Sequence, residues 1–344
     1  MSFLACRVFE KTESEKTESE KTSPKVQKTT IYHQLVQMET DELTAGDVLI
    51  RVDYSSINYK DALAASGRGK IMKQFPLNAG IDLAGVIVES DNDAYQAGDK
   101  VLVNGCGIGE QYDGGLAQYA RVKSDWVIKI PEAYDTRQAM IIGTAGFTAA
   151  LAIHRMQVND QKPEMGPIVV TGASGGVGSI AVNLLSKLGY EVIALTSRKS
   201  MHDYLFELGA NKVVSEDKLG MSDKPLGKAL FGGAIDNIGG KTLSNIIAHT
   251  QLWGNVASIG LAQSPNLEAK VFPFILRGVS LLGISSTNCP MPLRTKLWHQ
   301  FGKELPLPDF EAIVSKEIAL EDVSPYFDEL IDKKHHGRLI VNCQ

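Results

Sequence analysis

The sequence predicts an α/β protein of two domains, one rich in short β-strands and one built on a doubly wound parallel sheet. The chain of 344 residues is too long for one ordinary core and suits two. Short apolar segments separated by turns dominate its first part, and strands alternate with helices from residue 167 onward. We expect residues 1–128 and 287–344 to form the β-rich domain. The parallel sheet, residues 129–286, is then an insertion in it.

The β-rich domain is predicted from short aliphatic and β-branched segments with turns between them. A helix is expected after these strands at Asp135–Met156, interrupted by Gly143 and Gly146. The last strand of the chain, Arg338–Val341, is assigned to the same domain. The other expected strands of this domain are Val48–Val52, Ala84–Glu89, Ala97–Val103 and Gly114–Val122.

A tandem repeat stands near the N-terminus, where residues 10–21 repeat the unit Glu-Lys-Thr-Glu-Ser. It has no large apolar side chain before Val26, so it cannot bury enough surface to offset the entropy of ordering. We expect a solvated loop or a short exposed hairpin and assign it no function.

Composition excludes several kinds of partner. The net charge of −5, with mixed signs along the chain, argues against a nucleic-acid partner, which would leave a basic surplus or stripe. We find no apolar run near the roughly 18 residues of a membrane span, and no export signal. The four cysteines lie far apart without a CxxC pair, as expected of free thiols. The sequence therefore predicts a cytoplasmic protein.

The second domain is predicted from buried-type strands that alternate with helices at Gly178–Leu188 and Met201–Leu208. Such alternation is typical of a parallel sheet with helices on its faces. The expected strands are Pro167–Gly172, Tyr190–Thr196, Lys212–Ser215, Phe231–Asp236, Asn255–Ile259 and Val279–Ile284.

A glycine-rich turn joins the first of these strands to its helix, with Gly172, Gly175 and Gly178 in a Gly-x-x-Gly-x-x-Gly spacing. Such glycines allow a tight turn, close backbone approach to a pyrophosphate, and close packing of helix on strand. The helix N-terminus adds N–H groups and a favourable dipole for phosphate. The turn predicts a dinucleotide site, although a glycine-rich turn that binds nothing is the alternative.

The end of the second strand indicates which dinucleotide binds. NAD-binding proteins place an acid there, about twenty residues on, to hold the ribose 2′-hydroxyl. This chain has Thr196-Ser197-Arg198-Lys199 instead, which suits the 2′-phosphate of NADPH. Lys212, before the third strand, offers a further positive charge. As an alternative, Arg198 and Lys199 are ordinary surface charges.

The chain resembles the zinc-independent, quinone-oxidoreductase-like branch of the medium-chain dehydrogenases/reductases, and within it the acrylyl-CoA reductase (NADPH) group. The likeness covers nearly the whole chain from residue 45 onward, in the family's order, and departs at the N-terminal repeat. It rests on Ser55–Leu63, Gly80–Gly85, Met140–Ala149, Val169–Gly178, Leu208–Ala210, Gly233–Asp236, Pro273–Arg277 and Gly337–Arg338. The resemblance implies a GroES-like catalytic domain, a Rossmann sheet, and a homodimer in which the strand Val279–Ile284 pairs across a two-fold axis.

The resemblance also implies contacts that spacing alone does not place. Tyr59 is expected beside the nicotinamide, and Arg338 at the active site or the cofactor. The remaining implied contacts are Ser174, Gly175, Gly176 and Val177 for the pyrophosphate, Thr196, Ser197, Arg198 and Lys212 for the 2′-phosphate, and Leu261, Ile275 and Ser286 for the nicotinamide and its ribose.

We predict no metal site. Zinc-dependent dehydrogenases of this architecture use a Cys, a His within Gly-His-Glu, and a second Cys. At the matching places this chain has Gly80-Ile81-Asp82 and Asn58-Tyr59-Lys60-Asp61. His335 and His336 are neighbours that point apart, and we interpret them as exposed tail residues.

The expected reaction adds hydride from NADPH to the β-carbon of an enoyl thioester, leaving an enolate that hydrogen-bond donors must stabilise. Arg338, Asn58 and Tyr59 are the candidate donors, and Tyr59 or water protonates the α-carbon, with Lys60 or Asp61 tuning Tyr59. On spacing alone, a capped turn is the favoured interpretation of Asn58–Asp61, and the family resemblance reverses that choice. The nearby Arg68, Lys70 and Lys73 either meet coenzyme A phosphates or form a solvated loop.

Three functions stay open. The chain reduces a short enoyl-CoA, reduces quinones or free enones with the same hydride donor, or binds NADPH without turnover.

Overall fold

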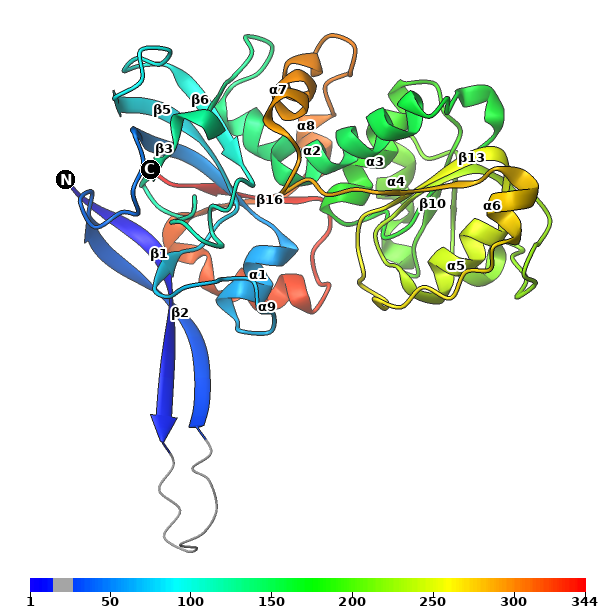
Figure 1. Ribbon diagram of the computed structural model, residues 1–344, viewed down its shortest axis with the longest axis horizontal. Coiled ribbons are helices and arrows are strands. Elements are labelled where there is room, and N and C mark those ends of the chain that lie inside the picture. The colour runs from blue at the N-terminus through cyan, green and yellow to red at the C-terminus, as the bar shows by residue number, and fades with distance from the viewer. Residues whose placement is uncertain (15–26) are drawn as a thin grey trace, which may run out of the picture. The chain divides into compact units, whose positions relative to one another are not determined.

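The computed structural model describes residues 1–14 and 27–344, so part of the N-terminal repeat lies outside the described residues. The chain forms two compact units. Unit 1 comprises Met1–Ile130, Lys316–Lys334 and Leu339–Gln344, and unit 2 comprises Pro131–Ser315 and His335–Arg338. Figure 1 shows the strands of unit 1 and the parallel sheet of unit 2 with its helices. The predicted fold class, a β-rich domain with a parallel sheet inserted in it, is confirmed.

The described residues of unit 1 form two sheets. The first has the order β2-β1-β4, in which β1 and β2 pair as a long antiparallel hairpin that contains the described part of the repeat. The second has the order β15-β16-β3-β5-β6-β8, with β7 paired to β3. The strands are β1 (Ser2–Ser14), β2 (Gln27–Glu39), β3 (Val48–Ile57), β4 (Leu77–Asn78), β5 (Asp82–Ser90), β6 (Lys100–Asn104), β7 (Tyr119–Val122), β8 (Ile128–Lys129), β15 (Val314–Ala319) and β16 (Arg338–Asn342).

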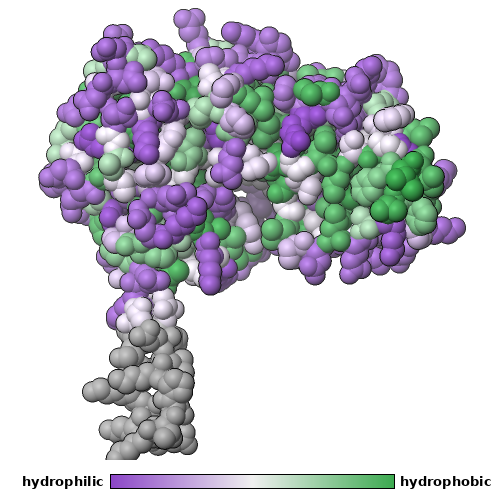
Figure 2. Space-filling model, viewed as in Figure 1, coloured by the Kyte–Doolittle hydropathy of each residue, from purple (hydrophilic) through white to green (hydrophobic). Residues whose placement is uncertain are grey.

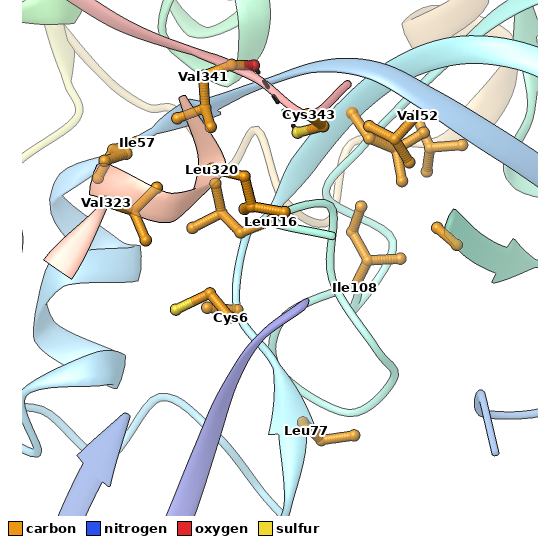
Figure 3. Close-up of a cluster of buried hydrophobic side chains, with 14 of the residues drawn as sticks. Cys6, Val52, Ile57, Leu77, Ile108, Leu116, Leu320, Val323, Val341 and Cys343 are labelled. Atoms are coloured by element: carbon orange, nitrogen blue, oxygen red, sulfur yellow. Dashed lines mark hydrogen bonds between the residues drawn. The ribbon is translucent and has the colours of Figure 1, made fainter. Parts of the chain in front are cut away.

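The core of unit 1 lies between these strands. Figure 3 shows Cys6 of β1, Val52 of β3, Val341 of β16 and Leu320 directed into one apolar cluster. Burial raises the pKa of the Cys6 thiol to about 12, so this thiol stays protonated. All four cysteines are free thiols, as the sequence predicts.

Two helices of unit 1, α1 (Tyr59–Ala65) and α9 (Ser324–Ile331), are tied to the hairpin by one histidine. The ring of His33 on β2 hydrogen-bonds the carbonyl of Ala65 through Nδ1 at 3.0 Å. Its Nε2 hydrogen-bonds the hydroxyl of Ser324 at 2.7 Å. The element that begins at Tyr59 therefore has a fixed position in unit 1.

Unit 2 is a parallel sheet in the order β11-β10-β9-β12-β13-β14. Counted along the chain, this is the strand order 3-2-1-4-5-6 of doubly wound dinucleotide-binding sheets. Figure 1 shows α2 and α3 on one face and α5 and α6 on the other. The strands are β9 (Ile168–Val170), β10 (Val192–Leu195), β11 (Lys212–Val214), β12 (Phe231–Asp236), β13 (Thr250–Ser258) and β14 (Ser280–Gly283). The helices are α2 (Thr136–Val158), α3 (Gly176–Lys187), α4 (His202–Glu207), α5 (Gly240–His249), α6 (Phe272–Arg277), α7 (Met291–Gln300) and α8 (Phe310–Ile313).

Helix α2 is broken at one glycine and buried along most of its length. Gly143 has φ 49° and ψ −160°, so the helix is interrupted there, as the sequence predicts; Gly146 does not interrupt it. By length and composition α2 is apolar enough to cross a membrane, contrary to our expectation that no such run exists. Its apolar window is 89% buried inside the structure, as in a core helix.

The units divide later than the sequence predicts, because residues 287–315 stay with unit 2 instead of returning to the β-rich domain at residue 287. Trp298 of α7 is fully buried and stacks on Phe147 of α2, with 6.1 Å between ring centroids. The hydroxyl of Tyr134 donates to the carbonyl of Trp298 at 2.9 Å. Asp309, before α8, accepts hydrogen bonds from Asn183 and Lys187 of α3. These contacts hold the segment on α2 and α3.

Candidate active site

The glycine turn between β9 and α3 forms an open backbone cradle. Gly172 takes a left-handed conformation with φ 56°, and Gly175 is the N-cap of α3. A Cβ on Gly178 would lie 2.3 Å from the carbonyl oxygen of Gly172, so this glycine is needed for close packing of helix on strand. A Cβ on Gly175 would meet only that same oxygen, at 3.4 Å, so the space in front of the helix is open. An open space before a helix N-terminus fits a pyrophosphate.

The turn lies where the strand order reverses, between β9 and β12. In sheets of this type, ligands bind at the carboxyl ends of the strands at that point. Here the Thr171 hydroxyl donates to Asp236 at 2.8 Å, and the Asn237 N–H donates to the Thr171 hydroxyl at 2.9 Å. Burial raises the pKa of the Asp236 carboxyl. These bonds fix the two strand ends beside the cradle.

The end of β10 is tied to the cradle by Arg198. Its Nη2 donates to the Ser174 hydroxyl at 2.5 Å, and its backbone N–H donates to Thr196 Oγ1 at 3.2 Å. Ser197 is exposed beside it. The structure thus brings Ser174, which was expected at the pyrophosphate, together with Thr196 and Arg198, which were expected at the 2′-phosphate.

The C-terminal residues of unit 2 also contact this corner. Arg198 Nη1 donates to the carbonyl of His335 at 3.0 Å, and Gly337 N–H donates to the carbonyl of Ser174 at 3.0 Å. The His336 ring meets the Tyr204 ring edge to face, with 4.8 Å between centroids. Both histidines are half-buried, so the interpretation of exposed tail residues is wrong.

Arg338 is buried with 2% of its surface exposed. Its Nε donates to the carbonyl of Ile141 at 3.0 Å, and its Nη2 donates to that of Met140 at 3.2 Å. These carbonyls precede the break of α2 at Gly143, which removes their helical partners. A Cβ on Gly176 would lie 3.4 Å from Nη1 of Arg338, so this nitrogen borders the cradle.

The other expected cofactor residues are more scattered. Leu261 and Ser286 follow the carboxyl ends of β13 and β14, so they lie toward the same end of the strands as the glycine turn. Lys212 is the first residue of β11 and pairs with Ile193, so its backbone lies toward the amino end of the strand. Ile275 is on α6, which leads into the amino end of β14, so it lies toward the end of the strands opposite the glycine turn (Figure 1).

In unit 1, Asn58 joins two buried carboxylates. Its Nδ2 donates to Asp82 at 3.1 Å and to Asp61 at 3.3 Å, and its backbone N–H donates to Asp61 at 2.8 Å. The hydroxyl of Ser56 donates to the other oxygen of Asp82 at 2.7 Å. Burial, and then the charge of Asp82, raises the pKa of Asp61 to about 7.

This network changes the roles expected of its members. The amide donors of Asn58 face carboxylates, so they do not suit an enolate oxygen, and Asp61 is buried and serves the backbone at Asn58 and Ile81. The capped turn, our alternative for this segment, is therefore present. Sequence reasoning missed the roles of Ser56 and Asp82; the signal was the carboxylate that ends Gly80-Ile81-Asp82, the run that replaces Gly-His-Glu of zinc-dependent proteins.

Tyr59 is the first residue of α1 and is 45% exposed. Its neighbour Lys60 forms an ion pair with Glu110 at 2.8 Å. In the expected coenzyme A cluster, Arg68 pairs with Asp328 at 3.2 Å, while Lys70 and Lys73 are exposed. Among residues 1–14 and 27–344, no three His, Cys, Asp or Glu side chains form a group that could hold a metal ion.

Comparison with known proteins gives the family. Residues 44–132 match the alcohol dehydrogenase GroES-like domain, and residues 176–301 match the domain described as zinc-binding dehydrogenase. AcuI of Escherichia coli (strain K12), named as an acrylyl-CoA reductase, is 45% identical over 88% of this chain and 93% of its own length. YhfP of Bacillus subtilis (strain 168), named as a quinone oxidoreductase, is 43% identical over 88% of this chain and 92% of its own length.

Solved structures agree with these matches. The yhdH oxidoreductase from Salmonella enterica, crystallised in complex with NADP, has a TM-score of 0.89 at 41% identity, and the match covers 99% of this chain and 100% of that one. The Bacillus subtilis yhfP structure with NAD bound has a TM-score of 0.90 at 39% identity, covering 99% of both chains. The GroES-like and Rossmann domains implied by the resemblance are confirmed. This chain belongs to the medium-chain dehydrogenase/reductase family, in its quinone-oxidoreductase-like branch.

Proposed function

We propose that this chain reduces the C=C bond of a short enoyl thioester with NADPH, converting acrylyl-CoA to propionyl-CoA. The observation that carries the cofactor choice is the contact of Arg198 with Ser174, which puts a guanidinium on the phosphate cradle at the strand end where NAD-binding proteins carry an acid. The relative named as an acrylyl-CoA reductase supports the choice of substrate.

The residues of unit 2 fit this cofactor. The N–H groups at the start of α3 and the open space at Gly175 would receive the pyrophosphate, with Nη1 of Arg338 at its border. Arg198, with Thr196 and Ser197, would receive the 2′-phosphate. When bound, NADPH supplies the hydride that adds to the β-carbon of the substrate.

Tyr59 is the residue we assign to the substrate. Addition of hydride moves the π electron pair of the double bond onto the thioester, as an enolate with its charge on oxygen. The hydroxyl of Tyr59 then gives its proton to the α-carbon and recovers it from water, which completes the saturated thioester. Asn58, Asp61 and Asp82 hold the turn on which Tyr59 begins its helix, so they are positioning residues.

Exposed Lys70 and Lys73 supply positive charge for the phosphates of coenzyme A. A quinone or a free enone would need the same hydride and the same proton but no such handle. The name of the relative YhfP favours this second candidate.

The test mixes the purified protein with NADPH and follows the loss of its near-ultraviolet absorbance with acrylyl-CoA, crotonyl-CoA and a small quinone. We expect oxidation with acrylyl-CoA, and a slower rate in a variant that replaces both Lys70 and Lys73 by alanine. A rate with the quinone alone would assign the second candidate. Tight NADPH binding without oxidation by any acceptor would mean a binding protein without turnover.

We also propose a homodimer built on the edge of the parallel sheet. Strand β14 ends the strand order and has an unpaired side, which is available to a second copy. Figure 2 shows apolar surface gathered over the end of unit 2 that carries α6. The large apolar side chains exposed there are Leu252, Trp253, Val271, Phe272, Ile275 and Leu276. Sedimentation should give a dimer, and Ile275→Asp, at a 71% exposed position, should shift it toward monomer.

A further inference from the structure

A short segment of unit 2, His335–Arg338, lies against the corner where Arg198 meets the phosphate cradle. Its position is fixed by backbone hydrogen bonds: Gly337 N–H donates to Ser174, and the carbonyl of His335 accepts from Arg198. Gly337 has φ 55°, and a Cβ there would lie 2.1 Å from the carbonyl oxygen of Ile313. Since no side chain fits at Gly337, the backbone that presents His336 has little freedom.

The charges around His336 come from three elements. Burial is the largest cause that lowers the pKa of its imidazole, followed by the charge of Arg198, after β10, and an electrostatic interaction with His335, on its own segment. Tyr204 of α4 packs on its ring, and burial raises the pKa of that phenol to about 12, so it stays neutral. The charge of Glu207 on α4 acts on Tyr204. In the absence of an anion, His336 is therefore neutral near neutral pH.

A bound 2′-phosphate would favour the protonated form of His336 instead. A phosphate monoester carries about −1.5 to −2 charges at neutral pH, more than one guanidinium offsets. Charge compensation in a partly buried site favours a second cation beside it. His336, whose ring packs on Tyr204 beside this corner, gains a positive charge with a single proton near neutral pH.

We propose, on the basis of the NADPH specificity above, that His336 is a second cationic ligand of the 2′-phosphate and takes up a proton from solvent as NADPH binds. The site then holds a guanidinium and an imidazolium against the phosphate. The contribution of His336 is full at pH values below its own pKa in the free protein and is lost as the pH rises through its higher pKa in the complex.

Titration calorimetry of the full chain with NADPH and with NADH tests this, between about pH 6 and pH 8 and in two buffers of different ionisation enthalpy, which count the protons exchanged. As the pH rises, we expect the affinity for NADPH to fall by at most about tenfold for each pH unit. NADH, which has no 2′-phosphate, should show no such dependence. His336→Gln should bind fewer protons with NADPH and should flatten its pH dependence.

The matched control is His335→Gln, because the contact of His335 with Arg198 uses its backbone carbonyl, which the substitution keeps. It also removes an interaction that lowers the pKa of His336, so it should shift the pH range of proton uptake without abolishing the uptake. The phosphate has a pKa near 6 and releases protons of its own, so the quantity to compare is the difference in proton uptake between the variants. Loss of proton uptake in His335→Gln instead of His336→Gln overturns the proposal, as does unchanged uptake in both. If the unaltered protein binds NADPH no better than NADH, the proposed cofactor specificity itself fails.

Discussion

Two alanine substitutions in one glycine turn should have opposite effects on stability and on cofactor binding. In Gly178→Ala, the new methyl would lie 2.3 Å from the carbonyl oxygen of Gly172 and 2.7 Å from Cα of Ala173. Both are backbone atoms, so helix α3 must move away from β9. Overpacking of this kind costs about 1–3 kcal/mol. Alanine's higher helix propensity returns up to about 1 kcal/mol of this.

In Gly175→Ala, the new methyl meets one atom, at 3.4 Å, and φ of −83° is ordinary for alanine. Alanine is a poorer N-cap than glycine but restricts the unfolded chain, and these effects nearly cancel within about 1 kcal/mol. The methyl instead occupies the space assigned to the pyrophosphate. We expect NADPH to bind roughly tenfold more weakly or worse, about 1.4 kcal/mol, in a protein of normal stability.

Scanning calorimetry and NADPH titration of both variants separate the two effects. Gly178→Ala should lower Tm by about 2–4 °C for each kcal/mol lost, while Gly175→Ala should melt close to the unaltered protein. If Gly175→Ala binds NADPH normally, the cradle is not the pyrophosphate site. If Gly178→Ala has the Tm of the unaltered protein, the close packing of α3 on β9 does not contribute to stability as argued.

Three further predictions concern single side chains. Arg198→Ala should weaken NADPH about 10–100-fold and leave NADH nearly unchanged in equilibrium titration, because charge-assisted bonds of about 1.5–3 kcal/mol are lost only with the phosphate; equal losses for both cofactors would contradict this. Tyr59→Phe should lower kcat with acrylyl-CoA about 10²-fold or more while NADPH affinity is kept, and an unchanged kcat would assign the proton to water. The pKa of Asp61 is raised from 3.8 to about 7, so its contribution to stability is fully present below 3.8, declines as pH rises and is lost above about 7. Denaturant midpoints between about pH 5 and 8 should show a shallower decline in Asp82→Asn, and an equal or steeper decline would rule out the charge of Asp82 as a cause.

The parts of the fold that follow from local pattern were predictable. The strands of the parallel sheet and the turn at Gly172–Gly178 are encoded by residues close in sequence, and the structure has them. The return of the chain to unit 1 was placed too early, because Trp298 stacks on a side chain about 150 residues away. Periodicity within the segment 287–315 contains no sign of that contact.

The site shows the same division. Thr196 and Arg198 follow from the spacing of a dinucleotide fold, and Ser174 follows from the family resemblance. The contact of His336 with Tyr204 depends on a segment from the far end of the chain. Asp82 was noticed only as part of the run that replaces Gly-His-Glu, because its hydrogen bond with Asn58 joins residues 24 apart in sequence. The donor roles first expected of Asn58 and Arg338 depended on their hydrogen-bond partners, which the sequence does not reveal.

The reduction itself is tested most directly with NADPH that carries deuterium at the transferable position of C4. We predict that incubation with acrylyl-CoA gives propionyl-CoA with deuterium at the β-carbon and a solvent-derived proton at the α-carbon, as read by mass spectrometry and NMR. Unchanged acrylyl-CoA, or saturated product without deuterium at the β-carbon, would contradict the proposed reaction.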